Sequence, residues 1–217
     1  SRRPQFPAML AVLLASKALT LPRVDAVNEI ASTRWLKLQT LDYTDQSGRA
    51  RKWDMATRTT KAAGVADAVV ILPLLRRAGE TLGETIVVEQ YRPPIGAPTV
   101  ELPAGLIDAG ESPQEAALRE LKEETGYTGT VSLLSEEVCM SPGLCDETVQ
   151  VVVVDVDLDA PENRDPAQQL DPGEFVVVRR VPLDAMREVL DAGAAMPIEG
   201  LYLLAIGLEV GRRSSIT

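Results

Sequence analysis

The sequence contains no histidine among its 217 residues. Histidine is the commonest general base near neutral pH and a frequent zinc ligand, so its absence excludes Ser-His-Asp triads and most zinc sites. Only two cysteines are present, Cys139 and Cys145, and they form neither a disulfide framework nor a CxxC metal motif. We therefore expect a reducing compartment and a chemistry that is carried by carboxylates.

The sequence also lacks an excess of positive charge and a long apolar run. The formal net charge is −10 and the isoelectric point is about 4.6, which argues against a general attraction to nucleic acid or anionic membranes. The apolar run at residues 9–15 is too short to span a bilayer. We expect no nucleic-acid partner, no membrane association and a cytoplasmic location, with a nuclear location and organelle targeting left open.

The length fits one catalytic domain with a small appendage. Residues 1–23 are basic and contain no acidic residue, and we interpret residues 1–30 as an N-terminal extension, with a transit or signal peptide as the alternative. Alternating apolar and polar residues on both sides of a turn predict a β-hairpin over 34–58, which we assign to a separate β lobe at 31–60. Residues 61–217 then form the main domain.

Periodic patterns predict the elements of the main domain. Strands are expected at 67–76, 85–92, 148–157 and 174–181, and helices at 113–125, 182–193 and 200–210. Together they predict an α+β fold in which a mixed β-sheet is sandwiched between helices, an αβα arrangement, with the hairpin as a small N-terminal lobe.

The helix expected at 113–125 has clear signals at both ends. Ser112 and Glu115 match a capping box, Pro113 suits the first helical position, and Gly126 can end the helix in the left-handed conformation. At about 100° per residue, three glutamates fall on one face. They are Glu120, Glu123 and Glu124.

The opposite side of this helix is expected to pack on the sheet through Ala117, Leu118 and Leu121. Three neighbouring carboxylates repel one another unless a cation neutralises them, and hard oxygen ligands suit Mg²⁺, with Mn²⁺ as an alternative. An ordinary solvated glutamate face is the competing interpretation.

The full spacing around this helix favours metal binding. It comprises Gly105, Glu111, Arg119-Glu120-Leu121, Glu123-Glu124 and Gly126. This pattern resembles the Nudix box at every position except the last, where Tyr127 replaces the usual aliphatic residue. Many fixed positions make such a motif specific.

The resemblance implies a Nudix fold and the hydrolysis of a diphosphate. It also implies that Glu120 and Glu124 bind the divalent cation with Glu123 assisting, and that the carbonyl of Ala104 is a main-chain ligand. Arg119 matches the residue that orients the glutamates.

The resemblance to one branch of the family indicates the substrate. Pro142 lies fifteen residues beyond the box, and the segments 89–94 and 101–108 are similar to those of eukaryotic-type ADP-sugar pyrophosphatases. This implies cleavage of ADP-ribose to AMP and ribose 5-phosphate. The alternatives are UDP-glucose or another nucleoside diphosphate sugar, and a non-catalytic nucleotide-sensing module.

Trp35 and Trp53, one expected on each arm of the hairpin, resemble tryptophans that sandwich the base, one from each subunit of a homodimer. Further substrate contacts are expected from Asp54, Arg58, Arg92, Glu101 and Leu106.

The general base has two candidate glutamates, and enzymes of the resembled family often place it on the loop that precedes the strand after the core hairpin. Glu174 occupies that place, at the start of the strand expected at 174–181, and Glu147 lies just after Pro142. The sequence does not choose between them.

Overall fold

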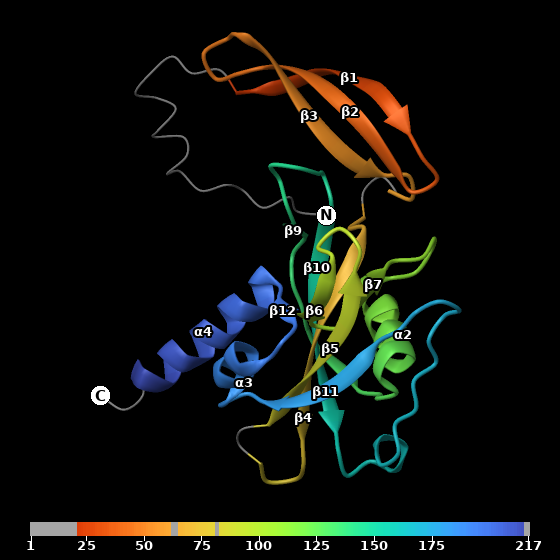
Figure 1. The fold of residues 1–217 in the computed structure, drawn as a ribbon, viewed down its shortest axis with the longest axis vertical. Helices are drawn as coiled ribbons and strands as arrows, with labels where there is room; N and C mark the ends of the chain where they lie inside the picture. Colours follow the sequence, from red (N-terminus) through yellow and green to blue (C-terminus); the bar gives the residue numbers. More distant parts are fainter. Residues whose placement is uncertain (1–20, 62–64, 81–82, 215–217) are drawn as a thin grey trace. The chain divides into compact units, whose positions relative to one another are not determined.

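The computed structural model describes residues 21–61, 65–80 and 83–214 (Figure 1). The chain divides into two compact units: a lobe that contains residues up to 63 together with 139–147, and a main unit that contains 64–138 and 148–217. Most of the expected N-terminal extension, residues 1–20, lies outside the described residues.

The lobe is a three-stranded antiparallel sheet in the order β1-β2-β3. Its strands are β1 (Arg23–Ser32), β2 (Leu36–Thr44) and β3 (Ala50–Arg58). The predicted hairpin corresponds to β2 and β3. Their turn contains Gly48, which has a φ of 78°. This is the left-handed conformation, which glycine adopts most readily.

Strand β1 occupies residues that the sequence analysis placed mainly in the N-terminal extension. The pairing of β1 with β2 shifts register between Val24 and Ala26 and again between Glu29 and Ala31. Such bulges interrupt the two-residue alternation by which a strand is recognised in a sequence. The lobe therefore begins near residue 23, and its boundary moves toward the N-terminus.

The main unit is built on a mixed sheet whose main path is β12-β6-β5-β4-β10-β8, with β7 on β4 and β11 on β5. Strands β4 and β10 run parallel, whereas β5 is antiparallel to β4, β6 and β11. The strands are β4 (Ala68–Arg76), β5 (Glu84–Arg92), β6 (Ala97–Glu101), β7 (Ala104–Leu106), β8 (Thr130–Leu134), β9 (Val138–Cys139), β10 (Thr148–Asp157), β11 (Val177–Pro182) and β12 (Met196–Pro197).

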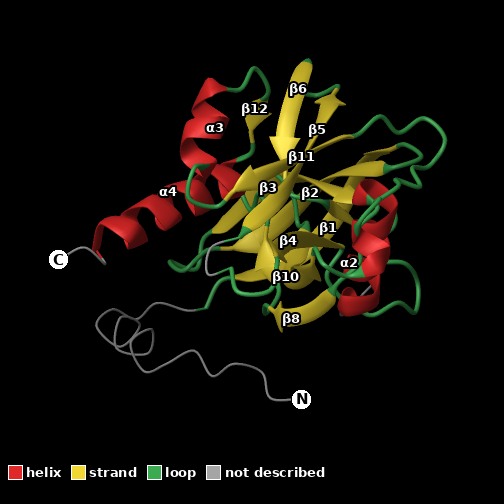
Figure 2. Ribbon diagram, turned by 90° about the horizontal axis from the view of Figure 1, so that it is seen from below, coloured by secondary structure: helices red, strands yellow, loops and turns green. Residues whose placement is uncertain are grey.

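Helices cover both faces of this sheet. Figures 1 and 2 show α2 on one side and α3 with α4 on the other. The helices are α2 (Pro113–Thr125), the short 3-10 helix η1 (Pro161–Asn163), α3 (Met186–Ala192) and α4 (Glu199–Ser214). Each face has its own apolar core, one around Leu121 and Ile71 and the other around Met186 and Leu201. The predicted α+β fold with a mixed sheet between helices is confirmed.

Several boundaries differ from the predicted ones. Strand β11 begins at Val177, so Glu174 lies in the preceding loop, and α3 begins at Met186. Among the described residues, no helix is long and apolar enough to cross a membrane.

Candidate active site

Helix α2 carries the candidate site, and the local sequence fixes both of its ends. The Ser112 side chain accepts from the N–H of Glu115, and the Glu115 carboxylate accepts from the N–H of Ser112, which forms a capping box. At the other end Gly126 is left-handed, with a φ of 78°, and donates its N–H to Lys122. The predicted span of 113–125 is confirmed.

The buried face of α2 differs from the predicted one. Ala117 and Leu121 pack on the sheet as expected, but Leu118 is exposed and Glu124 is 8% exposed. Glu124 follows Leu121 by three positions and Ala117 by seven, so a helix places the three side chains on one stripe. The carboxylate of Glu124 is therefore directed toward the sheet and away from bulk water.

Strand β7 meets this buried carboxylate. The N–H of Ala104 donates to Oε2 of Glu124 at 3.1 Å, so the residue predicted to be a main-chain metal ligand lies beside Glu124. A Cβ atom on Gly105 would lie 1.9 Å from the carboxyl carbon of Glu120. A side chain at position 105 would displace the Glu120 carboxylate from its place beside the strand, which is a physical reason for the glycine of the motif.

Arg119 connects the acidic residues around the helix. Its guanidinium donates to both carboxylate oxygens of Glu111, each at 2.9 Å, and to Glu120 and Glu123 at 2.8 and 3.1 Å. It also donates to the carbonyl of Leu106 at 3.0 Å. These bonds raise the pKa of Arg119, with Glu111 as the main cause. The orienting role predicted for Arg119 is consistent with this geometry.

The electrostatics of the site favour a bound cation. The pKa of Glu124 is raised to about 8, mainly by burial and also by the nearby carboxylates of Glu120 and Glu174, against the hydrogen bond from Ala104. Burial also raises the pKa of Glu120. A divalent cation would neutralise these carboxylates and lower their pKa values.

The donor set fits a hard divalent cation, because it consists of carboxylate and carbonyl oxygens. Among residues 21–61, 65–80 and 83–214, however, no three acidic or cysteine side chains are already arranged around one point as metal ligands. Arg119 instead binds Glu120 and Glu123. Metal binding therefore requires these side chains to reorient, which is within the reach of flexible glutamates.

A second ion pair lies in the same unit. Glu101 is 7% exposed, and both of its carboxylate oxygens accept from Arg92, at 2.8 and 2.7 Å. The hydroxyl of Thr99 donates to the same carboxylate at 2.5 Å. Burial raises the pKa of Glu101, but the bonds from Arg92 and Thr99 outweigh it and leave a net lowering. The structure thus gives Glu101 protein partners where a contact with ribose was predicted.

The sequence analysis did not identify Thr99 as a partner of Glu101. The alternation of side chains along β6 could have indicated it, because residues 99 and 101 lie on one face of the strand. Arg92 contributes to the electrostatic environment of Glu124, so the predicted phosphate contact of Arg92 lies in the region of the metal glutamates.

The two candidates for the general base lie in different units. Glu174 is in the main unit, and its charge contributes to the raised pKa values of both Glu120 and Glu124. Glu147 is in the lobe, where its Oε1 accepts from Nε of Arg58 at 2.9 Å and from Nη2 at 2.8 Å. Arg58, for which a substrate contact was predicted, thus forms an ion pair with Glu147.

The two tryptophans of the lobe do not share a cavity. Trp53 lies in β3 opposite Leu41, whereas Trp35 precedes β2, and Arg34 lies over its ring at 4.3 Å. Trp35 is thus on a turn and not on an arm of the hairpin. Six residues of strand separate Leu41 from Trp35, which corresponds to roughly 20 Å. One lobe therefore cannot place both indoles on a single base.

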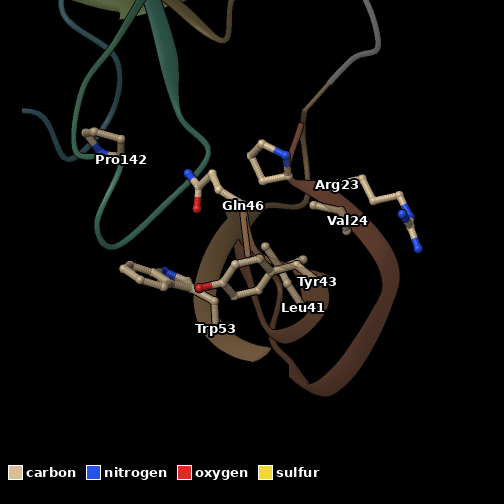
Figure 3. A pocket seen from close by; sticks show the side chains of 8 residues that line it. Arg23, Val24, Leu41, Tyr43, Gln46, Trp53 and Pro142 are labelled. Atoms are coloured by element: carbon tan, nitrogen blue, oxygen red, sulfur yellow. The ribbon is translucent and has the colours of Figure 1, made fainter. Parts of the chain in front are cut away.

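A cavity of about 470 Å³ surrounds Trp53 within the lobe. Figure 3 shows Tyr43 and Gln46 beside Trp53, Pro142 across the cavity, and Arg23 pointing away from it. Asp54 follows Trp53 in β3 and accepts from Thr40 at 2.5 Å, on the opposite face of the sheet. The side chain of Asp54 therefore does not line this cavity.

Comparison with known proteins places these features in a family. The model of the NUDIX domain matches residues 65–199. An uncharacterised Nudix hydrolase of Schizosaccharomyces pombe is 37% identical over 196 residues, which cover 88% of this chain and 94% of that protein.

Two further relatives carry the name of an activity. The ADP-ribose pyrophosphatase of Saccharomyces cerevisiae is 43% identical over 69% of this chain and 65% of its own length. The ADP-sugar pyrophosphatase of Mus musculus is 42% identical over 75% of this chain and 74% of its own length. The crystal structure of an ADP compounds hydrolase has the same fold, with a TM-score of 0.64 at 22% identity over 92% of this chain and 97% of that one.

Proposed function

The chain belongs to the Nudix family of pyrophosphohydrolases, and from this we propose that it hydrolyses ADP-ribose, or a closely related ADP-sugar, to AMP and a sugar phosphate. For ADP-ribose the second product is ribose 5-phosphate. The names of the yeast and mouse relatives support this substrate class, since the chain is 43% and 42% identical to them over the aligned residues.

One observation carries the proposal: a buried carboxylate, Glu124, lies in the company of two further carboxylates, Glu120 and Glu174. Glu124 is buried, Glu120 is half-buried and Glu174 is exposed, and carboxylates placed this close to a buried one cost free energy in the absence of a cation. A site that binds a divalent cation together with a diphosphate benefits from the same cluster.

The cation is proposed to be Mg²⁺, held by Glu120, Glu124 and the carbonyl of Ala104, with Glu123 assisting. When bound, it would neutralise the charge of the diphosphate and make a phosphorus atom more electrophilic. The chain itself contributes Arg119, which orients the glutamates, and Arg92, which is directed by Glu101 and can bind a phosphate oxygen.

Glu174 is proposed as the general base that accepts a proton from the attacking water. Its electrostatic effect on Glu120 and Glu124 supports this, because it requires the three carboxylates to lie near one another. Glu147 is proposed to have a structural role, since it forms an ion pair with Arg58 within the lobe.

The lobe is proposed to bind the base and to form a homodimer. All ten residues of β1 are exposed, and apolar side chains such as Val24, Val27 and Ile30 remain in contact with solvent. A three-stranded sheet with so little buried surface is marginal by itself, and a second copy of the chain would cover it. The separation of Trp35 from Trp53 supports a base held between tryptophans of two subunits.

The test is the release of AMP from ADP-ribose with Mg²⁺, measured for the wild type and for Glu124→Gln, with UDP-glucose assayed in parallel. Glu137→Gln, at an exposed glutamate outside the site, is the matched control. We expect rapid AMP release that Glu124→Gln abolishes and Glu137→Gln preserves. Turnover of UDP-glucose alone would reassign the substrate, and metal binding without turnover of either compound would indicate a nucleotide sensor.

A further inference from the structure

The loop that carries Glu174 is bound to the end of helix α2. The last four carbonyls of an α-helix have no partner within the helix and are satisfied by groups from outside. In α2, the carbonyl of Glu123 accepts from the main-chain N–H of Gln169 at 2.7 Å, and the carbonyl of Glu124 accepts from the side-chain amide of Gln168 at 2.6 Å. The backbones of two residues of the candidate metal site are thus held by two consecutive glutamines.

Gln168 has a second contact that Gln169 does not have. Its Nε2 also donates to the carbonyl of Val176 at 3.0 Å. One side-chain amide therefore joins Glu124, in the helix, to a residue two positions beyond Glu174 in the loop. A primary amide nitrogen has two hydrogens, and this arrangement uses both of them.

The approach of the loop to the helix is also fixed on its N-terminal side. A Cβ atom on Gly126 would lie 2.4 Å from the main-chain nitrogen of Ala167, so only glycine at position 126 allows the loop backbone to come this close. Gly126 therefore has two functions in the motif, since it ends the helix and also admits the loop.

Glu174 lies in a turn between Gln168 and Val176, the two loop residues that the amide of Gln168 connects to the helix. Its N–H donates to the carbonyl of Asp171 at 3.0 Å, and Oε2 of its carboxylate accepts from the N–H of Asp171 at 3.1 Å. The neighbouring Phe175 is 84% exposed and does not pack against the fold, whereas Val176 is buried and holds the end of the loop. The hydrogen bonds at residues 168, 169 and 176, together with the burial of Val176, hold this turn near the helix.

We propose that Gln168 is a positioning residue for the hydrolysis: its amide fixes the loop of Glu174 at the end of α2 and so sets the distance between the general base and the metal glutamates. The inference rests on the proposed function, because it takes Glu174 to be the base. Displacement of a catalytic group by about 1 Å can lower a rate by roughly a hundredfold, so a single bridging amide can have a measurable effect.

The experiment compares Gln168→Met with Gln169→Met in the full-length protein, using AMP release from ADP-ribose with Mg²⁺. Methionine keeps the length of glutamine but removes the amide, and Gln169 is the matched control because the structure uses its main-chain N–H. We expect Gln168→Met to lower kcat by about 10- to 100-fold with KM changed by less than about threefold. Gln169→Met is expected to keep kcat within about twofold of the wild type.

A double-mutant cycle with Glu174→Gln separates positioning from general damage. If Gln168 acts through Glu174, adding Gln168→Met to Glu174→Gln should lower kcat by less than about twofold more. An equal loss of kcat in both backgrounds, or wild-type kcat for Gln168→Met beside an impaired Glu174→Gln, would overturn the inference alone. Full activity of Glu174→Gln would instead overturn the assignment of the base, and the inference with it.

Gln168→Asn is the second variant in case Gln168→Met does not fold. It keeps the amide and its polarity but shortens the side chain by one methylene, so the two carbonyls can no longer both be reached in the same arrangement. The same loss of kcat that disappears in the Glu174→Gln background is expected, and unchanged kcat would overturn the proposal.

Discussion

Arg58 and Glu147 form an ion pair within the lobe, with Nε and Nη2 of the arginine 2.9 and 2.8 Å from the same carboxylate oxygen. We therefore expect Glu147→Gln to keep kcat within about threefold of the wild type, because its carboxylate is engaged by Arg58. Glu174→Gln is expected to lower kcat by about 10²- to 10⁴-fold, the usual contribution of a general base. AMP release from ADP-ribose measures both, and the reverse ranking would make Glu147 the base.

The metal-free protein should lose stability as the pH rises from about 4.5 to about 8, the interval between the ordinary pKa of a glutamate and the raised pKa of Glu124. In this interval the folded state holds a proton on Glu124 that the unfolded state has lost, so raising the pH favours unfolding. The loss is on the order of a few kcal/mol. Urea unfolding in the presence of a chelator, at a series of pH values, measures it.

Glu124→Gln supplies the control for this pH dependence. The variant has no carboxylate to ionise, so without metal it should be more stable than the wild type at pH 9 and similar to it at pH 4. Added Mg²⁺ should stabilise the wild type and leave the variant unchanged. Identical pH curves for the two proteins would contradict the prediction.

The ion pair between Arg92 and Glu101 should stabilise the fold, and Glu101 should also orient the guanidinium of Arg92. Arg92→Ala leaves a buried carboxylate without its main partner, which should cost on the order of 3 kcal/mol at neutral pH. Because the pKa of Glu101 is lowered in the wild type, the stabilisation is present at neutral pH and is lost as the pH falls through that lowered pKa. The difference between the two proteins should therefore shrink in acid.

The double variant Arg92→Ala/Glu101→Gln tests the cause of this loss. Removing the unpaired carboxylate charge of Glu101 should recover part of the thermal stability. AMP release should stay low because the arginine is still absent. If the double variant is less stable than Arg92→Ala, the charge of Glu101 is not the origin of the defect.

Gly105→Ala should impair activity without unfolding the protein. The added Cβ would lie 1.9 Å from the carboxyl group of Glu120, which is the end of a flexible side chain and can be displaced at little cost. We expect a rise in the Mg²⁺ concentration needed for half-maximal rate and a fall in kcat of about tenfold or more, since the displaced group is a proposed metal ligand. The melting temperature should change little.

Gly200→Ala is a matched control for this substitution, because no atom lies within 4 Å of the added Cβ. It should leave kcat and the metal dependence unchanged. A wild-type metal dependence for Gly105→Ala would remove Glu120 from the metal site.

Mixing two inactive tryptophan variants should restore activity if the base is held between subunits. In a heterodimer of Trp35→Ala and Trp53→Ala, one of the two shared sites regains both indoles. After subunit exchange, about one quarter of the wild-type activity is expected for a two-fold dimer. Light scattering reports the dimer independently, and a dimer without recovered activity would mean that the tryptophans do not share a site.

The active-site helix could be predicted from the sequence because its signals are local. The Ser112 and Glu115 caps, the Pro113 start and the Gly126 end all depend on residues within one or two turns, and the observed span agrees with the prediction. Local alternation likewise predicted β10 and the hairpin of β2 and β3. Strand β1 was missed because two bulges break the alternation on which strand recognition depends.

The sequence by itself determined the fold class, the family and the motif glutamates, because these depend on residue spacing along one segment. Tertiary structure decided which of them are buried and what each one contacts. Glu124 accepts from the N–H of Ala104 in β7, and Glu147 binds Arg58. Gln168 donates to the carbonyl of Glu124, although 44 residues separate the two in the sequence. Burial, charge pairing and pKa depend on distances between segments that are remote in the chain, and such distances exist only in the folded molecule.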